Sequence, residues 1–220
     1  LTLLSNREPI MVKTYILDVR PLSDGVKFEK YLAAVSDYRR NKVKSLNNKM
    51  AACLSLGVGI VMDFALGEYN LHEKDISLCF NEYGKPYISG RDGIFFSLSH
   101  SGSLAVCSAA DFEGGVDAEK IREFSPSVFS KICTPGEKKY LESLDTDLQK
   151  DEFFRLWTAR ESCVKFLGTG VLAKPVPFEF DFKTPPSFLG ENPPFLKEYA
   201  ADGYKITVCG EKKEFDEMPI

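Results

Sequence analysis

The chain has 220 residues, of which 44% are hydrophobic and 27% are charged, which is the composition of a globular protein with a buried core. Its formal net charge of −4 argues against general nucleic-acid binding, and no apolar run approaches the roughly 20 residues that cross a bilayer. The apolar start, LTLL, is too short for the core of a signal peptide, so we expect a cytoplasmic protein with no nucleic-acid or membrane partner.

The first half of the chain predicts strands and helices from its hydrophobic patterns. Strands are expected at residues 11–19, on both sides of a turn at 83–86 within 75–88, on both sides of residues 100–102 within 94–110, and at 114–121. Helices are expected at residues 26–46 and 51–66, and close packing would explain Gly57 and Gly59 in the second of them. We expect the ten residues before Met11 to be an extension that precedes the first strand of the fold.

The second half predicts helices followed by strands. Thr134 is a candidate helix N-cap, with Pro135 at the first helical position and Glu137 three residues after the cap. A strong helix is expected at residues 152–168, with Gly168 and Gly170 ending it. A loop is expected at 191–194, and strands at 178–182 and 204–210. Each half thus places helices before a strand pair. We predict an α+β fold of two similar halves, residues 1–112 and 113–220, packed as a pseudo-dimer with a cleft between them.

Cysteine and histidine spacing excludes the common metal sites of these residues. The six cysteines are widely spread with no Cys-x-x-Cys pair, and His72 and His100 are the only histidines. Zinc or iron–sulfur ligation is therefore not expected, and the cysteines are expected to be mostly buried, reduced thiols.

Two carboxylates, Asp117 and Glu119, flank Ala118 near the end of a predicted strand. Strand side chains at i and i+2 share a face, so both acids would point the same way and Ala118 would pack on the opposite face. Neighbouring carboxylates raise each other's pKa, and a divalent cation such as Mg²⁺, which prefers oxygen ligands, relieves this. The alternative is a solvated strand end with two surface acids.

Helix 152–168 carries a second set, in which Trp157, Glu161 and Lys165 lie at i, i+4 and i+8, near one face. Burial of Trp157 would anchor that face and leave Glu161 half-buried. An ordinary surface pair between Glu161 and Lys165 is the alternative explanation.

Two further segments are candidates for phosphate binding. His100 lies among small hydroxyl residues, where it can donate to a phosphate oxygen or simply cap a turn, and the absence of a G-x-S-x-G elbow argues against a Ser–His nucleophile. Five cations stand in residues 39–49, where they form either a phosphate clamp or a solvated helix face. A metal site, a phosphate clamp, a histidine donor and a lysine are together what phosphoryl transfer requires.

The segments FFSLSHSG, GGVDAEKI and FFRLWTARESCVKFLGTG, in this order, resemble the 4′-phosphopantetheinyl transferases of the surfactin-synthetase type. That family carries a Gly-Lys-Pro turn, a Ser-His-Ser segment, an Asp-x-Glu strand and a Trp-x-x-Lys-Glu-Ser-x-x-Lys helix. The resemblance covers about residues 11–170, with YKITVC at 204–209 as a further match.

The resemblance implies the transfer of the phosphopantetheine arm of coenzyme A to a serine of an acyl or peptidyl carrier protein, with release of adenosine 3′,5′-bisphosphate. By resemblance, Asp117, Glu119 and Glu161 would hold Mg²⁺, Lys165 would neutralise charge, and Glu161 or a metal-bound water would be the base. The residues expected to contact coenzyme A are Arg39, Lys42, Ser55, Gly84, Lys85, Pro86, Ser99, His100 and Lys165.

The chain departs from the family pattern at three positions, where Arg160 replaces a lysine, Leu54 an arginine and Thr169 a lysine. The carrier protein is not specified by the sequence, and a monomer is expected because one chain supplies both sides of the cleft. Two other functions remain open: a coenzyme A- or carrier-binding module without catalysis, and a different Mg²⁺-dependent phosphotransferase or nucleotide hydrolase. The absence of a P-loop glycine pattern argues against the latter.

Overall fold

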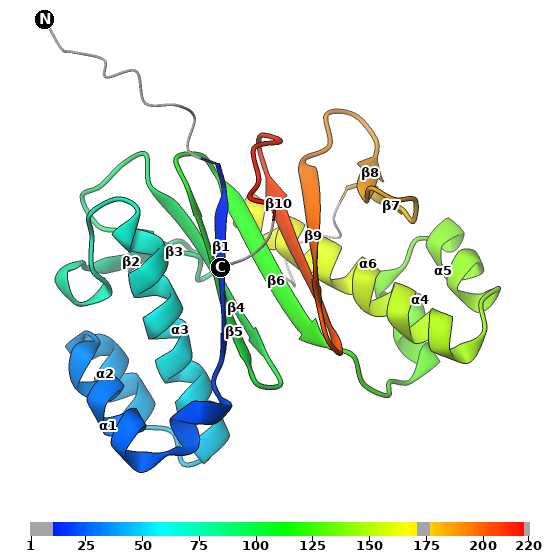
Figure 1. The fold of residues 1–220 in the computed structure, drawn as a ribbon. Helices are drawn as coiled ribbons and strands as arrows, with labels where there is room; N and C mark the ends of the chain where they lie inside the picture. Colours follow the sequence, from blue (N-terminus) through cyan, green and yellow to red (C-terminus); the bar gives the residue numbers. More distant parts are fainter. Residues whose placement is uncertain (1–10, 171–176, 218–220) are drawn as a thin grey trace, which may run out of the picture.

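Two three-stranded antiparallel sheets form the centre of the protein, and helices cover the outer side of each (Figure 1). The computed structural model describes residues 11–170 and 177–217. The predicted extension before Met11 lies outside the described residues. The mixture of helices and antiparallel sheets confirms the predicted α+β class.

The first half of the chain begins with β1 and ends with β5. Its elements are β1 (Lys13–Asp18), α1 (Gly25–Ala34), α2 (Asp37–Lys44), α3 (Lys49–Gly67), β2 (Leu78–Phe80), β3 (Pro86–Ile88), β4 (Phe95–Ser101) and β5 (Leu104–Ala110). The second half contains β6 (Gly114–Lys120), α4 (Phe129–Ile132), α5 (Pro135–Glu142), α6 (Thr146–Leu167), β7 (Glu179–Asp181), β8 (Ser187–Leu189), β9 (Phe195–Ala201) and β10 (Tyr204–Gly210). Short 3₁₀ turns occur at Arg20–Ser23, Glu73–Asp75 and Pro126–Val128.

The two sheets have the same internal order. In the first sheet the order is β1-β5-β4, and in the second it is β6-β10-β9, with each central strand antiparallel to both neighbours. A long helix, α3 or α6, packs on each sheet (Figure 1). This repeated order agrees with the expected pair of similar halves. The division near residue 112 lies between β5 and β6 and stays a prediction.

Helix α3 is the core helix of the first half. Gly57 and Gly59 confirm the predicted close packing: a Cβ on Gly57 would lie 2.4 Å from a methyl of Val19, and one on Gly59 would lie 3.0 Å from the Arg39 side chain. By length and composition α3 could cross a bilayer, contrary to the expectation from the sequence, but 72% of its apolar window is buried inside the fold. Its apolar surface is therefore used by the core.

The C-terminal segment ties the two halves together. Residues 211–217 return to β1, where Val12 pairs with Phe215 in an isolated bridge. The buried Asp216 accepts a hydrogen bond from the backbone N–H of Thr14 at 2.8 Å and another from the hydroxyl of Tyr199 on β9. One carboxylate thus bridges β1 of the first half and β9 of the second.

Several predicted boundaries need correction. The helix expected at 26–46 is two helices, because the Ser36 hydroxyl accepts the Arg39 N–H and starts α2. Helix α6 begins earlier than expected, with Asp145 as its N-cap. His100 lies inside β4, and the turn follows at Gly102, whose φ is +58°. Strand β9 was not predicted, because it is a half-exposed edge strand with mixed polar and apolar residues.

Other predictions are confirmed. Thr134 and Glu137 form the expected capping box of α5, and Gly168 ends α6 with φ of +66°. All six cysteines are free thiols. Four are buried as expected, whereas Cys79 is exposed and Cys133 is partly exposed.

Candidate active site

A cleft lies where the two halves meet, and it consists of two adjoining cavities of about 410 and 280 Å³. Gly84, Pro86 and Leu98 line both cavities, so the two lie next to each other. The larger cavity is lined by residues from α2, α3 and β4, and the smaller one reaches Glu161 and Lys165 of α6. The cleft therefore brings together segments that are far apart in the sequence.

Strand β6 supplies two carboxylates beside this cleft, behind the cavity-lining residues Ser99 and Lys165. Asp117 is buried, and its Oδ1 accepts hydrogen bonds from Ser99 Oγ at 2.8 Å and from Lys165 Nζ at 2.7 Å. Glu119 is half-buried, and its Oε2 accepts a hydrogen bond from Ser101 Oγ at 2.7 Å. Ala118 is 1% exposed in the apolar cluster behind the strand, which confirms that it packs away from the two acids.

Glu161 of α6 lies near enough to both β6 carboxylates for their negative charges to raise its pKa. Burial, followed by the negative charge of Asp117, raises the pKa of Glu161 to about 7, although Lys165 acts in the opposite direction. Burial also raises the pKa of Asp117, again against Lys165. Lys165 Nζ pairs with Asp117 and with the backbone oxygen of Val116, so a local helix pair with Glu161 does not explain this lysine.

The donor set fits a hard divalent cation. Asp117 Oδ2 is buried and has no hydrogen-bond partner, and Glu161 carries a raised pKa that a nearby cation would lower. Within residues 11–170 and 177–217, however, no group of three or more His, Cys, Asp or Glu side chains forms a preassembled metal cluster. Ser99 and Lys165 instead hold Asp117 Oδ1, and Ser101 holds Glu119 Oε2.

The other end of the cleft contains cations without full partners. Arg39 is 4% exposed, its Nε makes no hydrogen bond, and it lies 3.8 Å from Glu73. Burial and the nearby Arg39 both lower the pKa of Lys42. The buried Ser55 hydroxyl, which also lines this cavity, has no partner either. A bound phosphate would neutralise these two mutually repelling cations and accept a hydrogen bond from the unsatisfied hydroxyl.

The predicted basic run therefore divides into two groups. Arg39 and Lys42 line the cavity, whereas Arg40 donates to Asp37 and to the backbone oxygens of Leu32 and Val35, which stabilises α2. His100 lies at the exposed edge of the same cavity. Its pKa is lowered by partial burial, then by Lys165, Lys42 and Arg39, so cations from both ends of the cleft act on this imidazole.

The Gly-Lys-Pro turn contacts the end of α6 as well as the cleft. Gly84 and Pro86 line both cavities, while the Lys85 amine pairs with Glu113 and donates to the Phe166 backbone oxygen. The predicted contact of Lys85 with the cofactor stays a prediction. Sequence reasoning missed Asn81, whose amide donates to the Gly168 oxygen at 2.8 Å, because a single asparagine before a turn gives no long-range signal.

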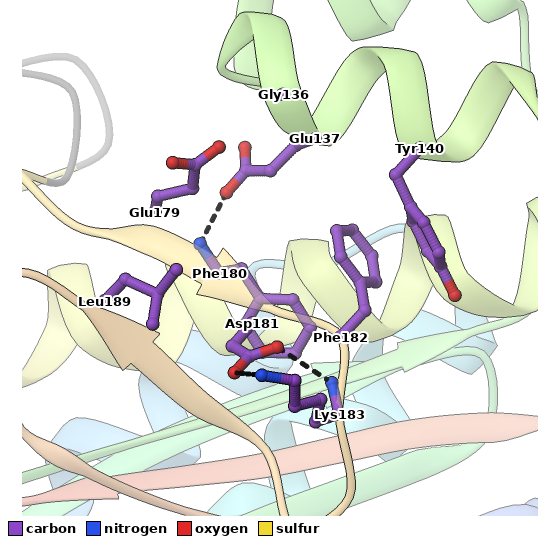
Figure 2. Close-up of a pocket in the computed structure, with 9 residues that line it drawn as sticks. All are labelled: Gly136, Glu137, Tyr140, Glu179, Phe180, Asp181, Phe182, Lys183 and Leu189. Carbon is purple, nitrogen blue, oxygen red and sulfur yellow. Dashed lines mark hydrogen bonds and ion pairs between the residues drawn. The ribbon is translucent and has the colours of Figure 1, made fainter.

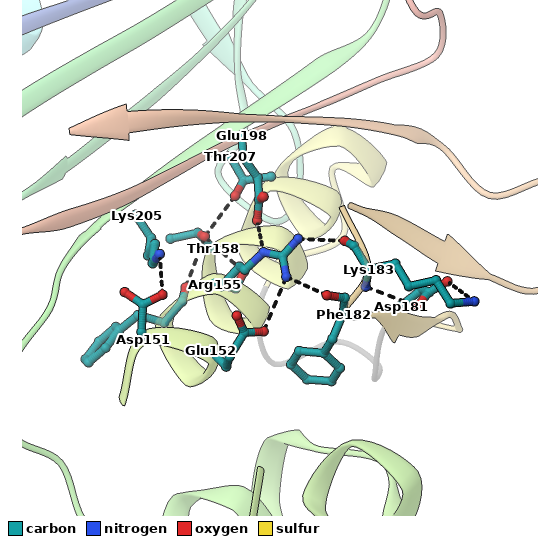
Figure 3. A network of polar contacts seen from close by, with 11 residues as sticks. Asp151, Glu152, Arg155, Thr158, Asp181, Phe182, Lys183, Glu198, Lys205 and Thr207 are labelled. Carbon is teal, nitrogen blue, oxygen red and sulfur yellow. Dashed lines mark hydrogen bonds and ion pairs between the residues drawn. The ribbon is translucent and has the colours of Figure 1, made fainter. Parts of the chain in front are cut away.

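The far side of α6 is anchored by a polar network (Figure 3). Arg155 pairs with Glu152 and Glu198 and donates to the backbone oxygens of Phe182 and Lys183. These contacts hold α6 between the second sheet and the segment after β7, and they fix the helix that carries Glu161.

A separate hollow of about 500 Å³ lies beside α5 and β7 (Figure 2). Its acids already have partners: Glu137 pairs with the buried Arg160 and accepts the Phe180 N–H, Glu179 accepts the Thr134 hydroxyl, and Asp181 pairs with Lys183. Arg160, which replaces the family lysine, thus has a structural role away from the cleft. This hollow offers no comparable set of unsatisfied groups, and the cleft is the candidate active site.

Comparison with known proteins finds relatives over most of the chain. A sequence model described as the 4′-phosphopantetheinyl transferase superfamily matches residues 114–209. The chain is 32% identical to a 4′-phosphopantetheinyl transferase of Bacillus subtilis, over 89% of this chain and 90% of that protein. It is 30% identical to the 4′-phosphopantetheinyl transferase Sfp of Bacillus subtilis strain 168, over 90% of this chain and 91% of that protein. A solved holo-(acyl-carrier-protein) synthase from Bacillus anthracis, in complex with CoA (3′,5′-ADP), is similar with a TM-score of 0.36 and 17% identity, over 46% of this chain and 94% of that one.

Proposed function

Because this chain belongs to the 4′-phosphopantetheinyl transferase family, we propose that its cleft transfers the phosphopantetheine arm of coenzyme A to a serine of a carrier protein. The observation that carries this proposal is a pair of adjoining cavities. One holds unsatisfied phosphate-binding groups, and the other is lined by Glu161 and by Lys165, which pairs with Asp117. In this reaction the serine oxygen bonds to the phosphorus that bears the pantetheine arm. The bond from that phosphorus to the departing adenosine 3′,5′-bisphosphate breaks.

The cavity beside α2 and α3 would bind the adenosine end of coenzyme A. Arg39 and Lys42 supply positive charge there, and the Ser55 hydroxyl supplies a donor that no described group satisfies. The 3′-phosphate matches this chemistry, because an arginine fork and a hydroxyl both donate to phosphate oxygens. The pyrophosphate would then extend past His100 toward Lys165. These two side chains are close enough for the charge of Lys165 to lower the pKa of His100.

Asp117, Glu119 and Glu161 would hold Mg²⁺. The support is the unpartnered Asp117 Oδ2 and the raised pKa of Glu161. When bound, the cation supplies charge neutralisation on the pyrophosphate. Lys165 Nζ, fixed by Val116 and Asp117, adds a second positive charge at the same point.

Burial raises the pKa of Glu161 to about 7 in the absence of a cation, and a cation held by this carboxylate would lower it. Glu161, or a water bound to that cation, would take the proton of the carrier serine as the oxygen attacks. The cleft draws its lining from both halves of one chain, which supports a monomeric enzyme. The absence of a P-loop glycine pattern from the sequence favours this reaction over nucleotide hydrolysis.

Mass spectrometry of carrier proteins tests this function. The protein is incubated with coenzyme A, Mg²⁺ and a panel of apo carriers from fatty-acid, polyketide and nonribosomal-peptide systems. A mass gain equal to one phosphopantetheine arm on a carrier is expected, and its absence from every carrier would refute the proposal.

The variant Glu161→Gln separates an enzyme from a binding module. Removal of the carboxylate charge is expected to lower turnover by at least about 100-fold, while coenzyme A still binds through the distant phosphate cavity. Isothermal titration with coenzyme A measures the binding. Unchanged turnover in Glu161→Gln would contradict the assigned role of this residue.

A further inference from the structure

A row of three serines on β4 joins the two sheets. Each serine hydroxyl accepts a backbone N–H from β6, across the junction where the sheets meet edge to edge. The pairs are Ser97 with Val116 at 3.0 Å, Ser99 with Ala118 at 3.2 Å, and Ser101 with Lys120 at 3.1 Å. In an ordinary sheet, these β6 N–H groups would donate to backbone oxygens of the neighbouring strand. Here they donate to serine side chains of β4 instead.

Two of these hydroxyls also donate to the candidate metal ligands. Ser99 donates to Asp117 at 2.8 Å, and Ser101 donates to Glu119 at 2.7 Å. A hydroxyl has a single proton, so each serine that accepts an N–H directs its own proton to the carboxylate. The backbone N–H and the hydroxyl polarise each other and strengthen the bond to the acid.

A second donor completes each arrangement on the same carboxylate oxygen. Asp117 Oδ1 also accepts Lys165 Nζ at 2.7 Å, and Glu119 Oε2 also accepts Arg122 Nη1 at 2.7 Å. Asp117 Oδ2 is left without a partner, and no hydrogen bond to Glu119 Oε1 is found in the described part of the chain. Each acid is therefore held through one oxygen while the other stays available to a cation.

We propose that Ser101 is a positioning residue for the divalent cation site, because it holds Glu119 Oε2 and leaves Oε1 free to bind the ion. Groups that orient a metal ligand commonly change metal affinity by about 10- to 100-fold when they are removed. Ser101 suits this role because it is half-buried, whereas the other donor, Arg122, has a side chain that is 57% exposed and is held less firmly. This inference rests on the proposed function, since it concerns the metal of that reaction.

Direct metal binding tests the role of Ser101 without turnover. Mn²⁺, a spectroscopic substitute for Mg²⁺, is titrated into the protein with coenzyme A but no carrier, and free Mn²⁺ is measured by electron paramagnetic resonance. Ser101→Ala is expected to raise the Mn²⁺ Kd about 10-fold, and Ser101→Thr, which keeps the hydroxyl, is expected to remain within about threefold of the wild type.

Ser97→Ala is the matched control. Ser97 makes the same bridge to β6 but donates to neither carboxylate in the described contacts. Its loss is expected to lower the melting temperature without changing the Mn²⁺ Kd. Equal changes in Kd for Ser97→Ala and Ser101→Ala would reduce the serine row to a structural role and overturn the proposal.

A second variant keeps the inference testable where Ser101→Ala does not fold. Ser101→Cys has nearly the same shape but is a much weaker donor, so it is also expected to weaken Mn²⁺ binding about 10-fold. An unchanged Kd in a folded Ser101 variant without the hydroxyl refutes the inference even when the carrier gains mass. A weakened Kd supports the inference even when no carrier gains mass, so its failure and that of the proposed function can be distinguished.

Discussion

Replacing Gly115 with alanine should displace α6, the helix that carries Glu161 and Lys165. Gly115 lies in β6 where the backbone of α6 crosses the strand. A Cβ at this position would lie 2.1 Å from the Ser162 oxygen and 2.4 Å from the Phe166 nitrogen. Both atoms are backbone, so no side chain can rotate away, and α6 must shift by about 1 Å or more to reach an ordinary contact of roughly 3.4 Å.

The shift should affect both stability and catalysis. Overpacking of this kind costs about 1–3 kcal/mol in the free energy of unfolding. Because α6 carries Glu161 and Lys165, a displacement of about 1 Å relative to Asp117 should also lower kcat by about 100-fold. Urea unfolding followed by circular dichroism measures the first effect, and the initial rate of carrier modification measures the second.

Gly114→Ala is the matched control for this prediction. It adds the same methyl group one residue earlier, where the nearest atom, the Cys209 oxygen, would lie 3.4 Å from the added Cβ, in ordinary contact. Gly114→Ala should therefore change stability by less than about 1 kcal/mol and leave kcat nearly unchanged. If Gly115→Ala behaved like Gly114→Ala in both assays, the close contact of α6 with β6 would not determine the geometry of the site.

Three further predictions concern other parts of the protein. Ser55→Ala should raise the KM for coenzyme A about tenfold, by loss of a hydrogen bond to phosphate, but not the KM for 3′-dephospho-coenzyme A; an equal rise for both would exclude Ser55 from the 3′-phosphate site. Asp216→Ala removes the acceptor of the buried Thr14 N–H and one of two acceptors of the Tyr199 hydroxyl, which keeps the backbone oxygen of residue 216. It should lower the free energy of unfolding by about 2 kcal/mol in urea denaturation, and a loss below about 1 kcal/mol would contradict its bridging role. Arg155→Met should cost about 3 kcal/mol in the same assay, whereas Lys205→Met, which breaks a more exposed pair, should cost less than about 1 kcal/mol; similar losses would show that burial of the network is unimportant.

Local signals in the sequence predicted much of the fold. The capping residues of α5, the glycine that ends α6 and the tight packing at Gly57 depend on contacts within a few residues or on a steric requirement of glycine itself. The break between α1 and α2 was missed because a serine is tolerated inside helices as well as at their ends. The long-range contact of Glu73 with the Ser36 backbone N–H and hydroxyl holds the cap at this position, and no local sequence pattern predicts that contact.

The chemistry of the cleft was less predictable from spacing than from the family resemblance. Helical spacing suggested a local pair of Glu161 with Lys165, but the lysine pairs with Asp117, 48 positions away in the chain. The family resemblance identified Asp117, Glu161 and Lys165 as site residues but did not give the contacts between them. The S-x-S-x-S spacing of β4 was visible in the sequence, yet its function depends on β6 lying beside it, which no local rule predicts.

Arg39 and Arg40 show why a charged run cannot be divided by sequence alone. The two arginines are adjacent and have the same intrinsic chemistry, but α2 turns about 100° between them. Arg39 consequently lines the cleft, buried and with an Nε that makes no hydrogen bond, whereas Arg40 faces the end of α1 and donates to the backbone oxygens of Leu32 and Val35. The start of the helix at Ser36 sets this rotation, and Glu73 holds Ser36. A helix cap held by a distant carboxylate thus determines which of the two cations faces the proposed phosphate site.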